Sequence, residues 1–250
     1  MPSAAPTPEK IARLALAELR AQADPERARR VQNYFKETVR SFGVPSPKVR
    51  EIAAGLYASI KKIWSVDQAV QLCAILFPKP ELESKAIAAL ILARYKRDFP
   101  RTLCARVKQW LVKNYLDNWA SVDTFCPEIM AALLSRYPEL VKELKTWPRH
   151  PNRWVKRASI VSFLKLTKNE GFLDIIYEQA ISLFPVADDL IHKANGWVLR
   201  EAGKRDLARL ERFLLAHGPA IPRTTLRYAI ERFPTARRRE LLLATRARDK

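Results

Sequence analysis

A repeat of 36 residues is the feature of this sequence that most restricts its fold. Five similar apolar stretches follow one another at this spacing, and their apolar residues recur every three or four positions, as in a helix. The stretches open at Val49, Lys85, Ser121, Arg157 and Lys193. A step of this size is about the length of a helix pair and is close to the roughly 34–47 residues of helical solenoid repeats. The period predicts antiparallel helix pairs stacked into an α-solenoid, a superhelix with a concave face.

The composition supports an all-α protein. Glycine is scarce, with 6 in 250 residues, and prolines separate segments of helical length. Alternating Val/Ile/Thr runs bounded by Asn-Gly or Asp-Gly, which are typical of strands, are absent. We expect a flexible N-terminus over residues 1–8 and one domain over 9–250. We expect the last element of this domain to be an Arg-rich helix over 236–250.

The charge points to a polyanion as partner. Lys and Arg number 45 against 26 Asp and Glu, a net charge of +19, and phosphate neutralisation gives affinity that does not depend on base sequence. We expect the concave face to be basic. Charge alone leaves DNA, RNA, a ribosome, a membrane surface and plain solubility open.

The same sequence argues for a cytoplasmic protein that does not span or bind a membrane. No apolar run approaches the roughly 18 residues of a membrane span, and the first residues, MPSAAPTPEK, do not resemble an export signal. The cysteines are three in number and show no CxxC spacing, which fits a reducing compartment.

Most catalytic chemistries lack their motifs. His150, His192 and His217 are scattered, so a metal is not expected, and nucleotide-binding or serine-hydrolase motifs are absent. We therefore predict no cofactor. Carboxylates, arginines and tryptophans remain as candidates.

The segment DNWASVDTF, residues 117–125, places Trp119 and Asp123 four residues apart, on one face of a helix. The slot of Asp123 holds Glu51, Ile87, Ser159 and Asn195 in the other repeats, and because it accepts Glu, Ser, Asn and Asp we expect a position that is not strictly buried. Pro127 cannot donate to the carbonyl of Asp123, and we expect the helix to kink or restart there. The alternative is that Asp123 is a solvated or capping residue.

Two further segments carry candidates. In NGWVLRE, Gly196 leaves bare backbone beside Trp197, which suggests a close approach of another group, with plain helix–helix contact as the alternative. In RWVKRAS, Arg153, Lys156 and Arg157 open a helix whose first N–H groups suit a phosphate, with a solvated run of charges as the alternative.

The segments DNWASVDTF, RWVKRAS and HKANGWVLREAGK, in this order, resemble the AlkD family of bacterial DNA glycosylases, which are built from HEAT-like repeats. NYFKETVRSFGVPSPKVREI and SKAIAALILARYK extend the resemblance over roughly residues 25–235. Asn118 departs from the family, where many relatives have Asp.

The resemblance implies a function and a site. The family's catalytic aspartate falls on Asp123, its two tryptophans that flank the lesion fall on Trp119 and Trp197, and its phosphate-binding arginine falls on Arg157. We add Lys156, Arg153 and Lys193 as phosphate contacts. The implied activity is the removal of cationic N3- or N7-alkylated purines from duplex DNA. We expect a monofunctional enzyme, because no candidate Schiff-base lysine stands out in the matched segments, and we expect a monomer.

Two other functions stay open. One is a non-catalytic relative that binds distorted or branched DNA. The other is a HEAT-type scaffold that binds a peptide and has little salt-dependent affinity for DNA.

Overall fold

Prolines mark the points at which several helices begin. In the computed structural model, which describes residues 6–246, Pro8 begins α1 (Pro8–Ala21) and Pro25 begins α2 (Pro25–Gln32). The ring fixes φ near the helical value, and the missing N–H would have had no partner in the first turn. Thr7 and Asp24 precede these prolines, and the side chain of each accepts a hydrogen bond from a backbone N–H in the first turn. The sequence thus sets these helix starts locally.

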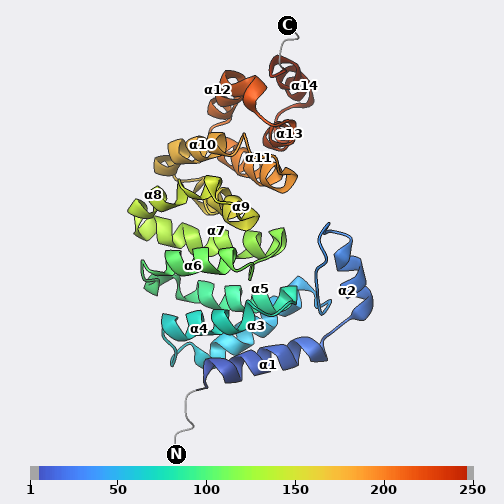
Figure 1. The fold of residues 1–250 in the computed structure, drawn as a ribbon, viewed down its shortest axis with the longest axis vertical. Helices are drawn as coiled ribbons and strands as arrows, with labels where there is room; N and C mark the ends of the chain where they lie inside the picture. The colour runs from blue at the N-terminus through green and yellow to red at the C-terminus, as the bar shows by residue number, and fades with distance from the viewer. Residues whose placement is uncertain (1–5, 247–250) are drawn as a thin grey trace, which may run out of the picture. The chain divides into compact units, whose positions relative to one another are not determined.

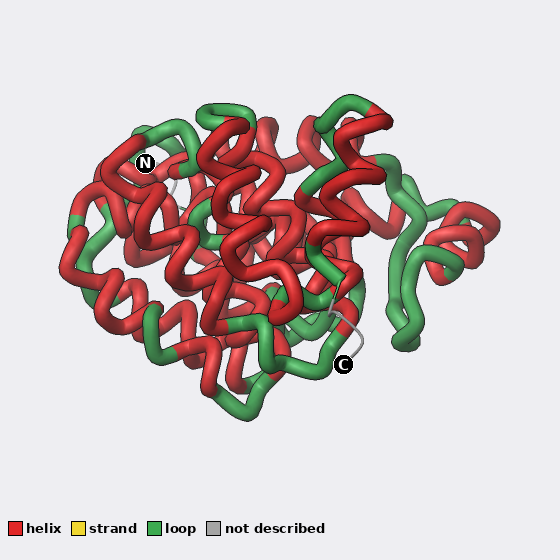
Figure 2. Tube along the Cα trace, turned by 90° about the horizontal axis from the view of Figure 1, so that it is seen from above, coloured by secondary structure: helices red, strands yellow, loops and turns green. Residues whose placement is uncertain are grey.

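The described residues form helices and loops without a strand, which confirms the prediction of an all-α, α-solenoid-like fold (Figures 1 and 2). By internal contacts the chain divides into two compact units, Met1–Arg136 and Tyr137–Lys250. Besides α1 and α2, the first unit contains α3 (Ser46–Ile60), α4 (Val66–Leu76), α5 (Leu82–Leu92), α6 (Leu103–Val112) and α7 (Trp119–Arg136). The second contains α8 (Val141–Leu144), α9 (Arg153–Val161), α10 (Leu173–Ser182), α11 (Asp189–Gly203), α12 (Leu207–His217), α13 (Arg223–Ala229) and α14 (Thr235–Ala244).

The 36-residue period corresponds to alternate helices. α3, α5, α7, α9 and α11 begin at residues 46, 82, 119, 153 and 189, so successive starts are 34 to 37 residues apart. Within the first unit α5 packs against both α3 and α7, and within the second unit α11 packs against both α9 and α13. The helices that carry the repeat are therefore next to one another within each unit.

Aromatic rings fill the centre of the first unit. Phe77, Trp110 and Phe125 meet edge to face, with ring centroids 5.0 to 5.9 Å apart. They come from the end of α4, from α6 and from α7, and all three are buried. Such pairs add about 0.5–1.5 kcal/mol each beyond the burial of apolar area, so this cluster fixes α7 against its neighbours.

Buried amides hold the second unit together. The side-chain N–H₂ of Gln179 in α10 donates to the backbone oxygens of Leu144 and Ser159, at 2.9 and 3.2 Å. The amide of Asn195 in α11 donates to the backbone oxygen of Ala180 at 2.9 Å. These bonds satisfy carbonyls near the ends of α8, α9 and α10, where intrahelical partners run out.

The sequence predicts a kink or a restart at Pro127. α7 continues through this proline without a break, so the restart is wrong. The proline removes one hydrogen bond, but Phe125, Cys126, Ile129 and Met130 around it are buried. The packing on this face holds the helix together across the missing bond.

All three cysteines are buried. Cys73 and Cys126 are fully inaccessible, and Cys104 is 2% exposed. Burial raises the pKa of the Cys73 thiol well above its ordinary value, because a thiolate would lose its hydration.

The two ends of the chain were predicted as a flexible segment over 1–8 and an Arg-rich helix over 236–250. Residues 1–5 and 247–250 lie outside the described part. The backbone oxygen of Pro6 accepts a hydrogen bond of 2.8 Å from the indole N–H of Trp64, and α1 begins two residues later. At the other end, α14 runs from Thr235 to Ala244.

Candidate DNA-binding surface

Trp119 and Asp123 lie one turn apart near the start of α7. Asn118 caps this helix, since its side-chain oxygen accepts a hydrogen bond of 2.9 Å from the N–H of Ser121. Ser121 and Val122 are buried, whereas Trp119 and Asp123 are both half-buried. The spacing of four residues therefore places an indole and a carboxylate together on the less buried side of α7.

The ring of Trp119 stacks on the ring of Phe35, with centroids 5.0 Å apart and planes inclined by 21°. Phe35 belongs to the segment between α2 and α3, which the repeat does not include. The two rings are part of the lining of a pocket in the first unit with a volume of about 300 Å³. NYF belongs to a segment that carries the family resemblance, but nothing in the sequence indicates that the phenyl ring lies on the indole.

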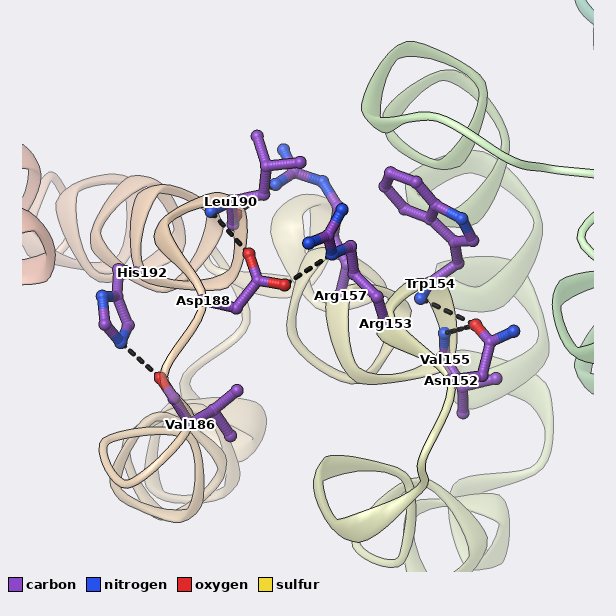
Figure 3. Close-up of polar contacts among 9 residues, drawn as sticks. All are labelled: Asn152, Arg153, Trp154, Val155, Arg157, Val186, Asp188, Leu190 and His192. Carbon is purple, nitrogen blue, oxygen red and sulfur yellow. Dashed lines mark hydrogen bonds and ion pairs between the residues drawn. The ribbon is translucent and has the colours of Figure 1, made fainter. Parts of the chain in front are cut away.

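The basic residues of RWVKRAS divide between the surface and the interior of the second unit. Asn152 caps α9 by accepting hydrogen bonds from the N–H groups of Trp154 and Val155, at 2.8 and 3.3 Å. Arg153 is exposed, and its Nε donates to Asp188 at 2.5 Å (Figure 3). Lys156 is half-buried. The first turn of α9 thus presents two cations, of which one is paired with an acid.

Arg157 is buried, with 5% of its surface exposed. Its guanidinium donates to the backbone oxygen of Leu190 in the first turn of α11 (Figure 3). The sequence spacing groups Arg157 with the other two cations at the start of the helix. In the structure, the Arg157 side chain instead links α9 to α11. A guanidinium stays charged when buried, so it still contributes positive potential nearby.

Lys193 and Trp197 lie one turn apart on α11, and both are half-buried. Lys193 pairs with Asp189 at 2.8 Å. The hydrogen bond to Asp189 raises the pKa of Lys193, and the positive charge of Arg157 opposes that rise. Lys193 is therefore charged at neutral pH and lies within electrostatic range of Arg157.

Gly196, next to Trp197, is explained by helix packing. A Cβ atom at this position would come within 2.4 Å of the backbone oxygen of Thr225 and 2.5 Å of Cβ of Tyr228, both on α13. Of the two explanations that the sequence left open, plain helix–helix contact accounts for this glycine.

A second pocket, in the second unit, gathers positive charge. Its volume is about 760 Å³, and its lining includes Arg149, Arg153, Lys156, Ser182 and Asp188. Arg149 is a cation that the sequence analysis did not single out, because it lies before α9 and outside the repeated stretches.

The predicted site residues thus form two groups. The first unit holds Trp119 and Asp123 on α7, and the second unit holds Arg153, Lys156 and Arg157 on α9 with Lys193 and Trp197 on α11. Within residues 6–246, no group of three or more His, Cys, Asp or Glu is placed to hold a metal ion. No helix in the same part of the chain is long and apolar enough to cross a bilayer.

Paired helices in tandem, with half-buried indoles and clustered cations, define an α-solenoid-like protein suited to a polyanionic ligand. The model of the DNA alkylation repair enzyme family matches residues 15–233, and the chain belongs to that family. This membership supports a role in the repair of alkylated DNA.

One solved structure with the same fold is described as a predicted DNA alkylation repair enzyme from Enterococcus faecalis. Its TM-score to this chain is 0.74 at 19% sequence identity, and the match covers 86% of this chain and 98% of that one. No curated protein matches the chain in sequence.

Proposed function

We propose that the protein is a monofunctional DNA glycosylase that hydrolyses the N-glycosidic bond of cationic N3- or N7-alkylated purines in duplex DNA. The observation that carries this proposal is the half-buried carboxylate of Asp123, one turn from the indole of Trp119, in a chain of the DNA alkylation repair enzyme family. The clustered cations of α9 and α11 support duplex DNA as the ligand.

The proposed reaction requires few catalytic groups from the protein. Alkylation at a ring nitrogen makes the base a good leaving group, so a strong general acid is not required. Positive charge develops on the deoxyribose as the bond breaks, and a carboxylate can stabilise it. At about 4 Å and an effective dielectric constant near 20, such an interaction is worth roughly 4 kcal/mol, or about a thousandfold in rate. That factor suits an activated lesion and is too small for an unmodified base.

In this proposal Asp123 stabilises the oxocarbenium-like transition state and orients the attacking water. Trp119 and Trp197 pack on the deoxyribose at the lesion and exclude solvent. Arg153, Lys156 and Lys193 contact phosphates, and Arg157 adds its charge to theirs. The reaction needs no cofactor, and we expect a monomeric, cytoplasmic enzyme.

Release of free base from methylated duplex DNA tests the proposal. The wild-type protein should release 7-methylguanine or 3-methyladenine, and Asp123→Asn should lower the rate about a thousandfold while DNA affinity is retained. Glu128→Gln is the matched control, because Glu128 is a half-buried carboxylate on the same helix; this variant should keep its rate. Equal rates in wild type and Asp123→Asn would refute the proposed role of Asp123. Tight binding without any release would instead favour the non-catalytic DNA-binding relative.

A further inference from the structure

Lys85, in the first turn of α5, is a buried cation. Its side chain is 3% exposed, and its ammonium donates a hydrogen bond of 2.5 Å to the Oδ1 atom of Asp117, whose side chain is 47% exposed. A buried ammonium without a partner is strongly unfavourable, because it loses its hydration. In the described part of the chain, Asp117 is the acid that pairs with Lys85. The pair therefore ties α5 to the segment that leads into α7.

Glu83, two residues before Lys85, is a second buried ion of α5, and other groups satisfy it. Its carboxylate accepts hydrogen bonds from the Ser41 hydroxyl and from the N–H groups of residues 42–44, at 2.6 to 3.2 Å. Hydrogen bonds to an ionised acceptor are about twice as strong as neutral ones. Both ions line the pocket of about 300 Å³ in the first unit, as does Trp119. Glu83 thus holds the segment before α3, and Lys85 holds the segment before α7.

Asp117 also contacts the residue that caps α7. The side-chain N–H₂ of Asn118 donates to the same Oδ1 atom of Asp117, at 2.9 Å. Asn118 is 2% exposed, and its side-chain oxygen accepts the hydrogen bond from the N–H of Ser121 in the first turn of α7. The amide serves both contacts, because it has a donor for the carboxylate and an acceptor for the N–H. Three hydrogen bonds in series thus connect the Lys85 ammonium to the first turn of α7.

The repeat places a comparable contact in the second unit. Lys85 and Arg157 occupy the same point of the 36-residue repeat, two steps apart. Arg157 is likewise buried, and its guanidinium donates to the backbone oxygen of Leu190 in the first turn of α11. In each unit, a buried cation of one repeat helix therefore holds the start of the next repeat helix. The acceptor differs, a carboxylate before α7 and a carbonyl in α11, but the helix held in each case carries proposed site residues.

We propose that Lys85 is a positioning residue for base release. Its ammonium fixes Asp117, and Asp117 fixes the cap residue Asn118. The cap sets the first turn of α7, and with it the places of Trp119 and Asp123. Lys85 itself touches neither DNA nor the reacting atoms. Because a misplacement of about 1 Å can cost about a hundredfold in rate, the effect of Lys85 falls on the reaction step. The inference rests on the proposed function, which makes Asp123 the catalytic carboxylate.

Base release in a single turnover, from a duplex with one 7-methylguanine and with protein in saturating excess, tests the proposal. Lys85→Met keeps an unbranched side chain and removes the charge, and the half-exposed Asp117 can then be hydrated, so the variant should fold. Its release rate should fall about 10- to 100-fold. Fluorescence anisotropy with a duplex that carries a tetrahydrofuran abasic-site analogue measures affinity. The dissociation constant should stay within about twofold of wild type, since the lost contact acts on the transition state.

Two further variants separate positioning from a loss of stability. Leu72→Ala is the stability control, because Leu72 is a fully buried side chain of α4, a helix outside the proposed site. The cavity it leaves should lower the stability of the protein, but the release rate should stay at the wild-type value. Asn118→Ala removes the cap directly. The double variant Lys85→Met/Asn118→Ala should be no slower than Asn118→Ala alone, because residues that act through one network are not additive.

Amide hydrogen exchange observes the same turn without any reaction. The N–H of Ser121 should exchange faster in Lys85→Met than in the wild type, and it should gain more than the N–H of Met130, further along α7. A wild-type release rate in Lys85→Met, an equal rate loss in Leu72→Ala, or additive losses in the double variant would overturn the positioning role and leave the proposed function intact. If the wild type releases no base, the proposed function fails instead. Exchange at Ser121 then decides whether Lys85 holds α7, and unchanged exchange refutes it.

Discussion

Gly196 of α11 lies so close to Thr225 of α13 that a single methyl group does not fit between them. A Cβ at position 196 would meet the backbone oxygen of Thr225 at 2.4 Å. The hydroxyl of Thr225 donates to the backbone oxygen of His192 at 3.1 Å, which fixes the two helices at this separation. This contact fixes the position of α11, which carries Trp197 and Lys193, against α13.

Gly196→Ala should therefore destabilise the protein by about 1–3 kcal/mol, as overpacking of a close contact does. Gly55→Ala is the matched change, because Gly55 also lies inside a helix and a Cβ there has nothing within 4 Å. That variant should gain up to about 1 kcal/mol from helix propensity. Urea unfolding of the two variants measures both effects, and equal shifts would contradict the packing explanation.

Glu83→Ala should cost about 2–4 kcal/mol, because several N–H groups of residues 42–44 lose a buried charged acceptor at once. The loss should be accompanied by faster amide exchange at these residues. Glu51→Ala removes an exposed carboxylate, 69% accessible and paired with Lys48, and should change stability by less than about 0.5 kcal/mol. Unfolding in urea and hydrogen exchange test the two variants, and slow exchange at 42–44 in Glu83→Ala would contradict the role of the Glu83 carboxylate in holding these N–H groups.

The Glu211–Arg237 pair should make a small contribution to stability that depends on pH. The hydrogen bond from Arg237 lowers the pKa of Glu211 below its ordinary value of 4.5. An acid with a lowered folded-state pKa stabilises the fold above its ordinary value and loses this effect as the pH falls through the folded pKa. Glu211→Gln should thus lower Tm by under about 2 °C at pH 7, since the pair is partly exposed, and by progressively less below pH 4.5. A difference that grows on acidification would show that the sign is wrong.

Lys156→Ala should weaken binding by a similar factor for DNA of any base sequence, as expected for a phosphate contact. It should also reduce the slope of log Kobs against the logarithm of the salt concentration by about 1. Lys168→Ala removes the same charge from an exposed position that is outside the proposed surface, and its slope should stay at the wild-type value. Titrations at several salt concentrations give the slopes. An unchanged slope in Lys156→Ala would remove this residue from the proposed phosphate contacts.

The sequence predicted the stacked helices well, because their cause is periodic. Lys85 and Ser121, for example, both lie in the first turn of their helices, α5 and α7, and such a pattern can be read without knowing any long-range contact. How deeply each side chain is buried was harder to predict. Arg157 shares its helix start with two accessible cations, yet its side chain reaches inward to Leu190, and no local spacing distinguishes these directions.

The contact between Phe35 and Trp119 could not be predicted from the sequence, and here the cause is different. Phe35 occupies a non-repeating segment whose course depends on Glu83, a residue more than 40 positions away. Pro127 shows the opposite case, since a strong local signal for a helix break is overcome by burial on both sides of it.

The burial of Cys73, Cys104 and Cys126 makes the protein a ready background for site-specific labelling. Alkylating dyes react with thiolates, so inaccessible thiols react slowly, and the raised pKa of Cys73 slows its reaction further. A single cysteine introduced on an exposed position such as Lys168 should take up a maleimide fluorophore selectively, with the native cysteines left in place. The natural thiols then need no replacement before the protein is observed by fluorescence.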